Sequence, residues 1–178
     1  MQRIQPLDPQ TASGKTKELL DKVQKKFGKI PNIMRTMAQS PAVLDSYLSF
    51  SGAISAGSLS PKLREQISLA VAQINHCDYC LAAHSLIGKT TGLNEQEILD
   101  ARRGKAADAK TAAALKFAVQ LAEQRGCAAN EDIQRLRQAG HSDGEIMELV
   151  AVVALNIFTN YINHVAETEV DFPKAPAL

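Results

Sequence analysis

The stretch Glu65–His84 reads EQISLAVAQINHCDYCLAAH and places an acid, two thiols and an imidazole within twenty consecutive residues. Just ahead of it, Ser60 and Pro61 are a typical N-cap and first helical residue. Apolar side chains then recur with helical period as far as Ile74. Polar residues interrupt this pattern, and the alanine-rich end of the stretch predicts a second helix. We therefore expect two consecutive helices, folded back on each other, to organise this part of the fold.

The spacing of the thiols and the imidazole indicates redox chemistry. In a helix that begins near Cys77, Cys80 and His84 are four residues apart and share a face. An imidazole beside a thiol can accept its proton or stabilise the thiolate, which is the nucleophilic form. Cys77 precedes Cys80 by three residues, so closing a disulfide between them needs a local adjustment. A pair of this kind suits a reversible redox centre better than a permanent cross-link.

Two effects disagree on which sulfur attacks. The positive end of the helix dipole favours a thiolate at Cys77. The imidazoles of His84 and His76, one turn after and one turn before, favour Cys80. We assign the nucleophile to Cys80 and the resolving role to Cys77, because a proton acceptor activates and recycles the group. Glu65 has to arrive from the preceding helix, where it can orient His84 and raise its basicity.

The pattern E-x11-C-x2-C-x3-H resembles that of the alkylhydroperoxidase D (AhpD) and carboxymuconolactone decarboxylase superfamily, specifically its peroxidase-related branch. The stretch 156–173, NIFTNYINHVAETEVDFP, also resembles the ending of peroxidase-related members. The resemblance implies an all-α, AhpD-like fold. It implies one domain over residues 1–178 with a core at about 30–170, and a homo-oligomer, a trimer or a hexamer.

The resemblance also implies residue roles. The family's peroxidatic cysteine falls on Cys80, its resolving cysteine on Cys77, and its proton-relay pair on His84 and Glu65. The prototype carries a further histidine where this chain has Tyr79, which we place in the pocket. A tyrosine hydroxyl can donate a hydrogen bond to a departing oxygen, but its pKa of about 10 makes it a poor base. Decarboxylase members lack the paired cysteines, so the motif favours a peroxidase.

Other polar residues are candidates for the pocket. Asn160 and His164 are four residues apart on a long apolar C-terminal helix, where they could face Cys80, with Asn160 or Asn163 holding a peroxide or a water. A hydrogen-bonded histidine in the core is the alternative for His164. His76 is a further candidate, although a polar residue at a helix junction often only caps it. His141, in a Gly-His-Ser turn, is predicted to lie on the surface.

The rest of the chain predicts helices punctuated by Gly, Pro and capping residues, without sustained strand alternation. The expected ranges are 13–27, 32–39, 41–56, 61–75, 78–89, 95–103, 107–125, 131–139 and 143–166. A shift of 80 residues superposes Glu65 on Glu145. The same shift superposes His84 on His164, which suggests an internally duplicated helical unit. A capping box formed by Ser142 and Glu145 explains that glutamate equally well.

Composition limits the classes of partner and of location. The 178 residues are 45% hydrophobic, enough for a core, and a net charge of +1 gives no electrostatic basis for binding nucleic acid or an anionic membrane. We interpret the basic cluster of Lys22, Lys25, Lys26 and Lys29 as a solvated helix face. The N-terminal stretch lacks the apolar segment of a signal peptide, and the longest apolar run, 149–155, is shorter than a membrane span.

Cysteine usage points to a reducing compartment. Two of the three cysteines form the CxxC motif, and Cys127 is predicted to be a spare thiol. We therefore expect a cytoplasmic location. The family resemblance implies an enzyme that reduces hydroperoxides with electrons from a dithiol or lipoyl-type reductant, and we expect neither a cofactor nor a metal. A disulfide exchanger, a redox sensor and a helical interaction module are alternatives. A structural zinc site is another, built from Cys77, Cys80 and His84 with His76 or Glu65.

Overall fold

The computed structural model describes residues 2–178, and over these residues the chain contains helices and loops but no strand. The all-α prediction is confirmed, and each predicted helix is found with its ends shifted by two residues at most. The described residues form α1 (Gly14–Phe27), α2 (Asn32–Met37), α3 (Pro41–Ser55), α4 (Pro61–Ile74), α5 (Asp78–Thr90), α6 (Glu95–Arg102), α7 (Ala109–Glu123), α8 (Asn130–Gln138) and α9 (Asp143–Ala166).

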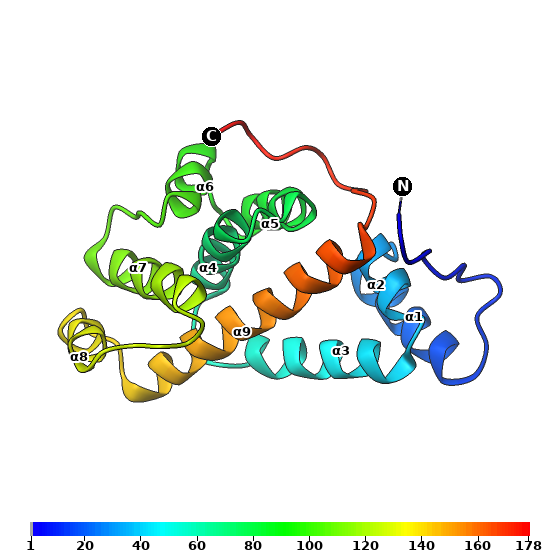
Figure 1. Cartoon of the computed structure of the whole chain (residues 1–178), viewed down its shortest axis with the longest axis horizontal. Coiled ribbons are helices and arrows are strands. Elements are labelled where there is room, and N and C mark those ends of the chain that lie inside the picture. Colours follow the sequence, from blue (N-terminus) through cyan, green and yellow to red (C-terminus); the bar gives the residue numbers. More distant parts are fainter. Residues whose placement is uncertain (1) are drawn as a thin grey trace.

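Helix α9 is the central element of the arrangement (Figure 1). It contacts α3, α4 and α7 along its length, while α2 and α5 also reach it. Beyond α9 the chain turns back, and the C-terminal segment, red in Figure 1, returns toward α6. There the Arg102 guanidinium donates a hydrogen bond of 2.5 Å to the carbonyl of Pro176.

Two apolar clusters fill the interior, and α9 contributes to both. The first surrounds the N-terminal half of α9 and combines buried residues of α4, α6, α7 and α9, among them Ile67, Leu69, Ile98, Leu115, Leu149 and Val153. The second combines residues of α1, α2, α3 and α5, among them Leu19, Leu20, Val23, Met37, Leu44, Cys77 and Cys80, with Phe158 and Ile162 of α9 packed against it. The CxxC motif therefore lies inside a core.

By length and composition, α9 is the one helix among residues 2–178 that could cross a membrane. It has 24 residues, with a mean hydropathy of 1.4 over its most apolar window. In this fold it packs against α3, α4 and α7 and buries Asn156, Asn160 and Asn163. Core helices of soluble proteins share this apolar composition, so the composition of α9 does not decide the matter.

The turn between α4 and α5 is a helix stop followed at once by a helix start. His76 has a φ of +53°, the left-handed conformation that often ends a helix. The amide of Cys77 donates to the carbonyl of Ala72 at 2.9 Å, and the amide of His76 donates to that of Gln73 at 3.1 Å. These two bonds are the Schellman pattern. Cys77 is also the N-cap of α5, with its sulfur accepting the amide of Cys80 at 3.3 Å.

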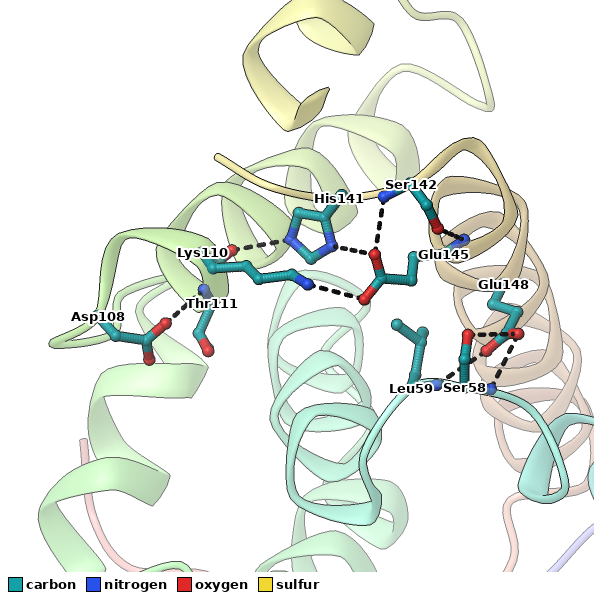
Figure 2. Close-up of polar contacts among 9 residues, drawn as sticks. All are labelled: Ser58, Leu59, Asp108, Lys110, Thr111, His141, Ser142, Glu145 and Glu148. Carbon is teal, nitrogen blue, oxygen red and sulfur yellow. Dashed lines mark hydrogen bonds and ion pairs between the residues drawn. The ribbon is translucent and has the colours of Figure 1, made fainter. Parts of the chain in front are cut away.

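The N-terminus of α9 carries a polar cluster (Figure 2). The Ser142 hydroxyl accepts the amide of Glu145 at 3.1 Å, and the Glu145 carboxylate accepts the amide of Ser142 at 2.7 Å, which confirms the predicted capping box. The carboxylate also accepts a hydrogen bond of 2.8 Å from Lys110. Together, the lysine and the backbone amide lower the pKa of Glu145 to about 2.

The prediction that His141 lies on the surface is wrong. Its side chain is fully buried in this cluster, with Nε2 3.0 Å from the carbonyl of Lys110 on α7 and Nδ1 4.0 Å from the Glu145 carboxylate. A turn residue is buried here because α7 covers it (Figure 2). Its position is therefore set by a contact between segments distant in sequence.

A second carboxylate of α9 holds the loop before α4 through hydrogen bonds. The carboxylate of Glu148 accepts the amides of Ser58 and Leu59 at 3.0 and 2.9 Å, and these bonds lower the pKa of Glu148 (Figure 2). A Cβ added to Gly57 would lie 2.6 Å from that carboxylate, so a larger residue there would displace the carboxylate from its present position.

The suggested duplication does not relate two equivalent helix pairs. Under the 80-residue shift, the break between α4 and α5 at residues 75–77 corresponds to residues 155–157. Those residues lie in the middle of α9, which is uninterrupted. The capping box is thus the sufficient explanation of Glu145.

Candidate active site

The two motif cysteines are joined. Cys77 and Cys80 form a disulfide with their Cα atoms 5.3 Å apart, and both residues are almost fully buried. The junction described above brings this about, because Cys77 completes the turn after α4 and caps α5, while Cys80 lies in the first turn of α5. The third cysteine, Cys127, is exposed and free, as predicted.

Glu65 and His84 meet across the two helices, as the sequence predicted. The Glu65 Oε2 atom lies 2.7 Å from Nδ1 of His84, and both side chains are mostly buried. A carboxylate accepts hydrogen bonds, so Nδ1 is the protonated nitrogen in a neutral ring. The other nitrogen, Nε2, is then free to accept a proton, which is the arrangement that a general base requires.

Two asparagines of α9 contact the sulfurs directly, a feature that the sequence reasoning missed in part. The amide nitrogen of Asn160 lies 3.0 Å from Cys80 Sγ, and that of Asn163 lies 3.2 Å from it. Asn163 also lies 3.8 Å from Cys77 Sγ. Asn160 had been expected to face a pocket, whereas its amide is directed at sulfur. A sequence signal existed, since Asn156, Asn160 and Asn163 repeat at helical spacing on an apolar helix.

Further hydrogen bonds hold these amides in place. The side chain of Asn75, at the C-cap of α4, donates to Oδ1 of Asn160 at 2.8 Å. Since the oxygen of Asn160 is engaged, its NH2 group is the part left to face Cys80. The neighbouring Asn156 instead donates to Ser68 at 3.0 Å and to the carbonyl of Val152 at 2.9 Å. The amide at Asn156 thus has oxygen partners, and the one at Asn160 has sulfur.

A cavity of about 460 Å³ opens beside this group. Cys80, His84, Glu65 and Asn163 line it, together with mostly apolar side chains of α1, α3, α5 and α9. Its volume is within the usual range for small-molecule sites. Among the described residues that line the cavity, Cys80 is the only cysteine.

Tyr47 of α3 lines the same cavity and was not identified from the sequence. Burial, and then the negative charge of Glu65, raise the pKa of Tyr47. Its hydroxyl therefore keeps its proton at neutral pH. Nothing in the sequence singles it out, because a tyrosine within an apolar helix is usually a core residue.

Tyr79 also lines the cavity, but its hydroxyl is already engaged. It donates to Oδ1 of Asp171 at 2.7 Å and accepts the amide of Ile33 at 3.1 Å. Burial is the main cause that raises the pKa of Tyr79. In this arrangement the Tyr79 hydroxyl is not free to donate to a departing oxygen, because it already donates to Asp171 in the C-terminal segment. Phe172 packs edge-on against the Tyr79 ring, with centroids 5.5 Å apart.

The two remaining histidine candidates do not line the cavity in the described chain. His76 is exposed because it occupies the left-handed position of the Schellman turn. His164 is exposed as well. The face of α9 turned toward the motif contains Asn156, Asn160 and Asn163, and His164 lies past the edge of that face. The alternative of a buried histidine at position 164 is wrong for the same reason.

The residues of the alternative zinc site do not converge. His76 is exposed, and Glu65 is bonded to His84. Within residues 2–178, no group of three or more His, Cys, Asp or Glu side chains has an arrangement that could hold a metal ion.

The all-helical frame that holds this disulfide and the imidazole–carboxylate pair is similar to the AhpD-like fold. The family model for the carboxymuconolactone decarboxylase family matches residues 41–124, which span α3 to α7. The matched segment carries Glu65, both motif cysteines and His84. Among proteins with curated functions, none matches this chain.

Solved structures share the fold over nearly the whole chain. An alkylhydroperoxidase AhpD core, an uncharacterized peroxidase-related protein from Ralstonia eutropha JMP134, is 22% identical, with a TM-score of 0.83 over 96% of this chain and 92% of that chain. An uncharacterized peroxidase-related protein from Silicibacter sp. TM1040 is 23% identical, with a TM-score of 0.80 over 93% and 91%. The debrominase Bmp8, as a C82A variant in complex with 2,3,4-tribromopyrrole, is 20% identical, with a TM-score of 0.80 over 94% and 91%.

Proposed function

We propose that this chain is a thiol-dependent peroxidase in which Cys80 reduces an organic hydroperoxide. The observation that carries the proposal is the difference between the two sulfurs. Cys80 lines the cavity together with His84 and is the nearer sulfur to both asparagine amides, whereas Cys77 contributes nothing to the described lining. Amide donors stabilise an anionic sulfur more than a neutral one, so they favour the thiolate.

The first step consumes the hydroperoxide. Glu65 orients His84, whose Nε2 takes the proton of the Cys80 thiol. The thiolate attacks the terminal oxygen of R–O–O–H, so that an S–O bond forms and the O–O bond breaks. The departing alkoxide takes a proton from the imidazolium and leaves as an alcohol, and Cys80 becomes a sulfenic acid.

The second step converts the Cys80 sulfenic acid into the Cys77–Cys80 disulfide. The Cys77 sulfur attacks Cys80, the S–S bond forms, and the S–O bond breaks with release of water. An external dithiol then reduces the disulfide by exchange and becomes a disulfide itself. A lipoyl-type group is the expected donor. A cytoplasmic location, the absence of a resident cofactor and a trimeric or hexameric assembly belong to the same proposal.

Asn163 gives the proposal a second support. Its Oδ1 atom is buried and has no hydrogen-bond partner within residues 2–178, and the residue lines the cavity. A buried acceptor without a partner is costly. The O–H group of a hydroperoxide can supply the missing hydrogen bond while the amide nitrogen remains on the sulfur.

The test is consumption of hydrogen peroxide and tert-butyl hydroperoxide with dihydrolipoamide as donor. We expect turnover in the wild type and in Cys127→Ser, which removes the exposed thiol, and none in Cys80→Ser. In Cys77→Ser, a dimedone adduct should accumulate on Cys80. Full activity of Cys80→Ser would overturn the assignment, and an adduct confined to Cys77 in Cys80→Ser would reverse the roles. A wild type that exchanges disulfides without consuming peroxide would be an exchanger or a sensor.

Reductive debromination is the second candidate, favoured by the structural likeness to a debrominase and by the apolar cavity. In this reaction, the Cys80 thiolate takes bromine from carbon to form an S–Br bond, and the carbanion left behind takes a proton. Cys77 then closes the disulfide and expels bromide. Release of bromide from 2,3,4-tribromopyrrole under reducing conditions measures this activity directly.

A further inference from the structure

The charged groups around the cavity are predominantly positive. Lys26, Lys29 and Arg64 line it, while Glu65, bonded to His84, is the single acidic residue in the described lining. The sequence reasoning had placed all the lysines of the basic cluster on a solvated face. They are exposed, but Lys26 and Lys29 also border the cavity, and Lys22 and Lys25 do not.

The two bordering lysines differ in availability. Lys29 lies 3.9 Å from the carboxylate of Asp171, donates to its backbone carbonyl at 3.1 Å, and sits 3.8 Å from the centroid of Phe172. Lys26 lies 5.2 Å from the centroid of Phe27, and no acidic side chain within residues 2–178 forms an ion pair with it. The Lys26 charge is thus available to an anion at the edge of the cavity.

Exposed apolar side chains surround the same opening. Phe27, Leu86 and Ile87 are 46%, 39% and 38% exposed, and all three line the cavity. Large apolar residues exposed together at a cavity indicate a surface that a ligand covers. Ile54, Val152 and Leu155 add further apolar side chains to the lining.

Resting on the proposed function, we propose that the cavity binds amphiphilic carboxylates and that its substrate class is the hydroperoxides of fatty acids. The carboxylate pairs with Lys26 at the edge, the hydrocarbon chain covers Phe27, Leu86 and Ile87, and the hydroperoxide group reaches Cys80. The chemistry is that of the peroxidase cycle: the fatty-acid hydroperoxide becomes the hydroxy acid, and the external dithiol supplies both electrons.

The test compares linoleate hydroperoxide with its methyl ester, which keeps the chain and removes the charge. We expect the wild type to show a KM for the acid about threefold to fivefold below that for the ester, in keeping with an exposed ion pair. In Lys26→Glu this preference should disappear or reverse through KM, with kcat unchanged. Lys25→Glu makes the same change of charge one residue away, outside the cavity, and should keep the preference.

Two readouts separate this proposal from the peroxidase assignment. Binding of linoleate itself, measured by calorimetry, needs no peroxide chemistry and should weaken in Lys26→Glu but not in Lys25→Glu. Consumption of hydrogen peroxide, which has neither chain nor charge, measures the peroxidase chemistry of the wild type without the carboxylate contact. Equal KM values for acid and ester in the wild type, or equal losses in the two variants, would overturn the proposal. If linoleate binding depended on Lys26 but the protein consumed no peroxide, the carboxylate site would be supported and the peroxidase assignment would be contradicted.

Discussion

The two ends of α9 both hold polar side chains in hydrogen bonds, but their partners differ in kind. At its N-terminus, Ser142, Glu145 and Glu148 bind backbone amides, a lysine and loop groups, all ordinary oxygen and nitrogen partners (Figure 2). Toward its C-terminus, Asn160 and Asn163 direct their NH2 groups at sulfur. Disulfide and thiol sulfur are weak acceptors, so their hydrogen bonds offset little of the cost of burying these amide groups. The hydrogen bonds become stronger when the sulfur is an anion.

The difference separates groups that hold the fold from groups arranged for chemistry. Removal of a partner at the N-terminal cluster should change the free energy of unfolding and leave reactivity unchanged. Removal of an amide at the sulfur should change reactivity more than stability. The variants that follow test this separation.

The largest effect is expected for Asn160→Ala. Loss of a hydrogen bond to the Cys80 thiolate should raise its pKa and lower peroxide turnover by about tenfold to a hundredfold, since one donor to a developing anion has about that weight. Alkylation of the reduced protein by iodoacetamide as a function of pH gives the pKa of the thiol. Asn156→Ala is the control, because that amide bonds oxygen atoms and its loss should leave the alkylation profile in place. An unchanged profile in both variants would show that the amides do not act on the thiolate.

The next largest effect concerns Glu65→Gln. An amide in place of the carboxylate keeps the size of the side chain but no longer accepts a charge-assisted hydrogen bond from His84. We expect kcat to fall by about tenfold, as for loss of a group that orients an imidazole, with the melting temperature little changed. Equal activity of Glu65→Gln and the wild type from pH 6 to 9 would contradict the orienting role.

Glu145→Gln tests the other end of α9. Loss of the Glu145 carboxylate should lower the free energy of unfolding, measured with urea, by about 1 to 2 kcal/mol and leave peroxide turnover unchanged. The folded-state pKa of about 2 lies below the ordinary value of 4.5, so the carboxylate stabilises the fold at neutral pH. This contribution is lost as pH falls from about 5 toward 2. The wild type and the variant should therefore converge in acid.

The smallest effects are expected for the two exposed histidines. His164→Ala should change neither activity nor stability by more than about 0.5 kcal/mol, as is usual for the surface. His76→Gly should raise the free energy of unfolding by up to about 0.5 kcal/mol, because glycine adopts the left-handed turn without strain. A large loss of turnover in either variant would show that the histidine takes part in the active site.

Local signals explain why the helices could be predicted so closely. Ser60, Asn94 and Ser142 cap helices through their own side chains, which is a short-range preference readable from the sequence. The pairing of Glu65 with His84 was predictable too, because the short turn between α4 and α5 makes these consecutive helices pack against each other. Each of these inferences uses residues close in sequence.

The parts that escaped prediction depend on contacts between distant segments. The rotation of α9, which turns Asn163 inward and His164 outward, is set by packing against α3, α4 and α5. The burial of His141 depends on α7, and the engagement of the Tyr79 hydroxyl depends on Asp171, 92 residues away. Helical spacing indicates which residues share a face, but not which face a neighbouring helix covers.

The asparagine amides also affect the reduction potential of the Cys77–Cys80 pair. Because they stabilise a Cys80 thiolate more than a disulfide sulfur, they shift the equilibrium toward the dithiol and make the reduction potential of the pair less negative. Each 1.4 kcal/mol of this preference raises the potential by roughly 30 mV. In the proposed peroxidase cycle, a pair with such a potential would stay mostly reduced even with a weakly reducing donor.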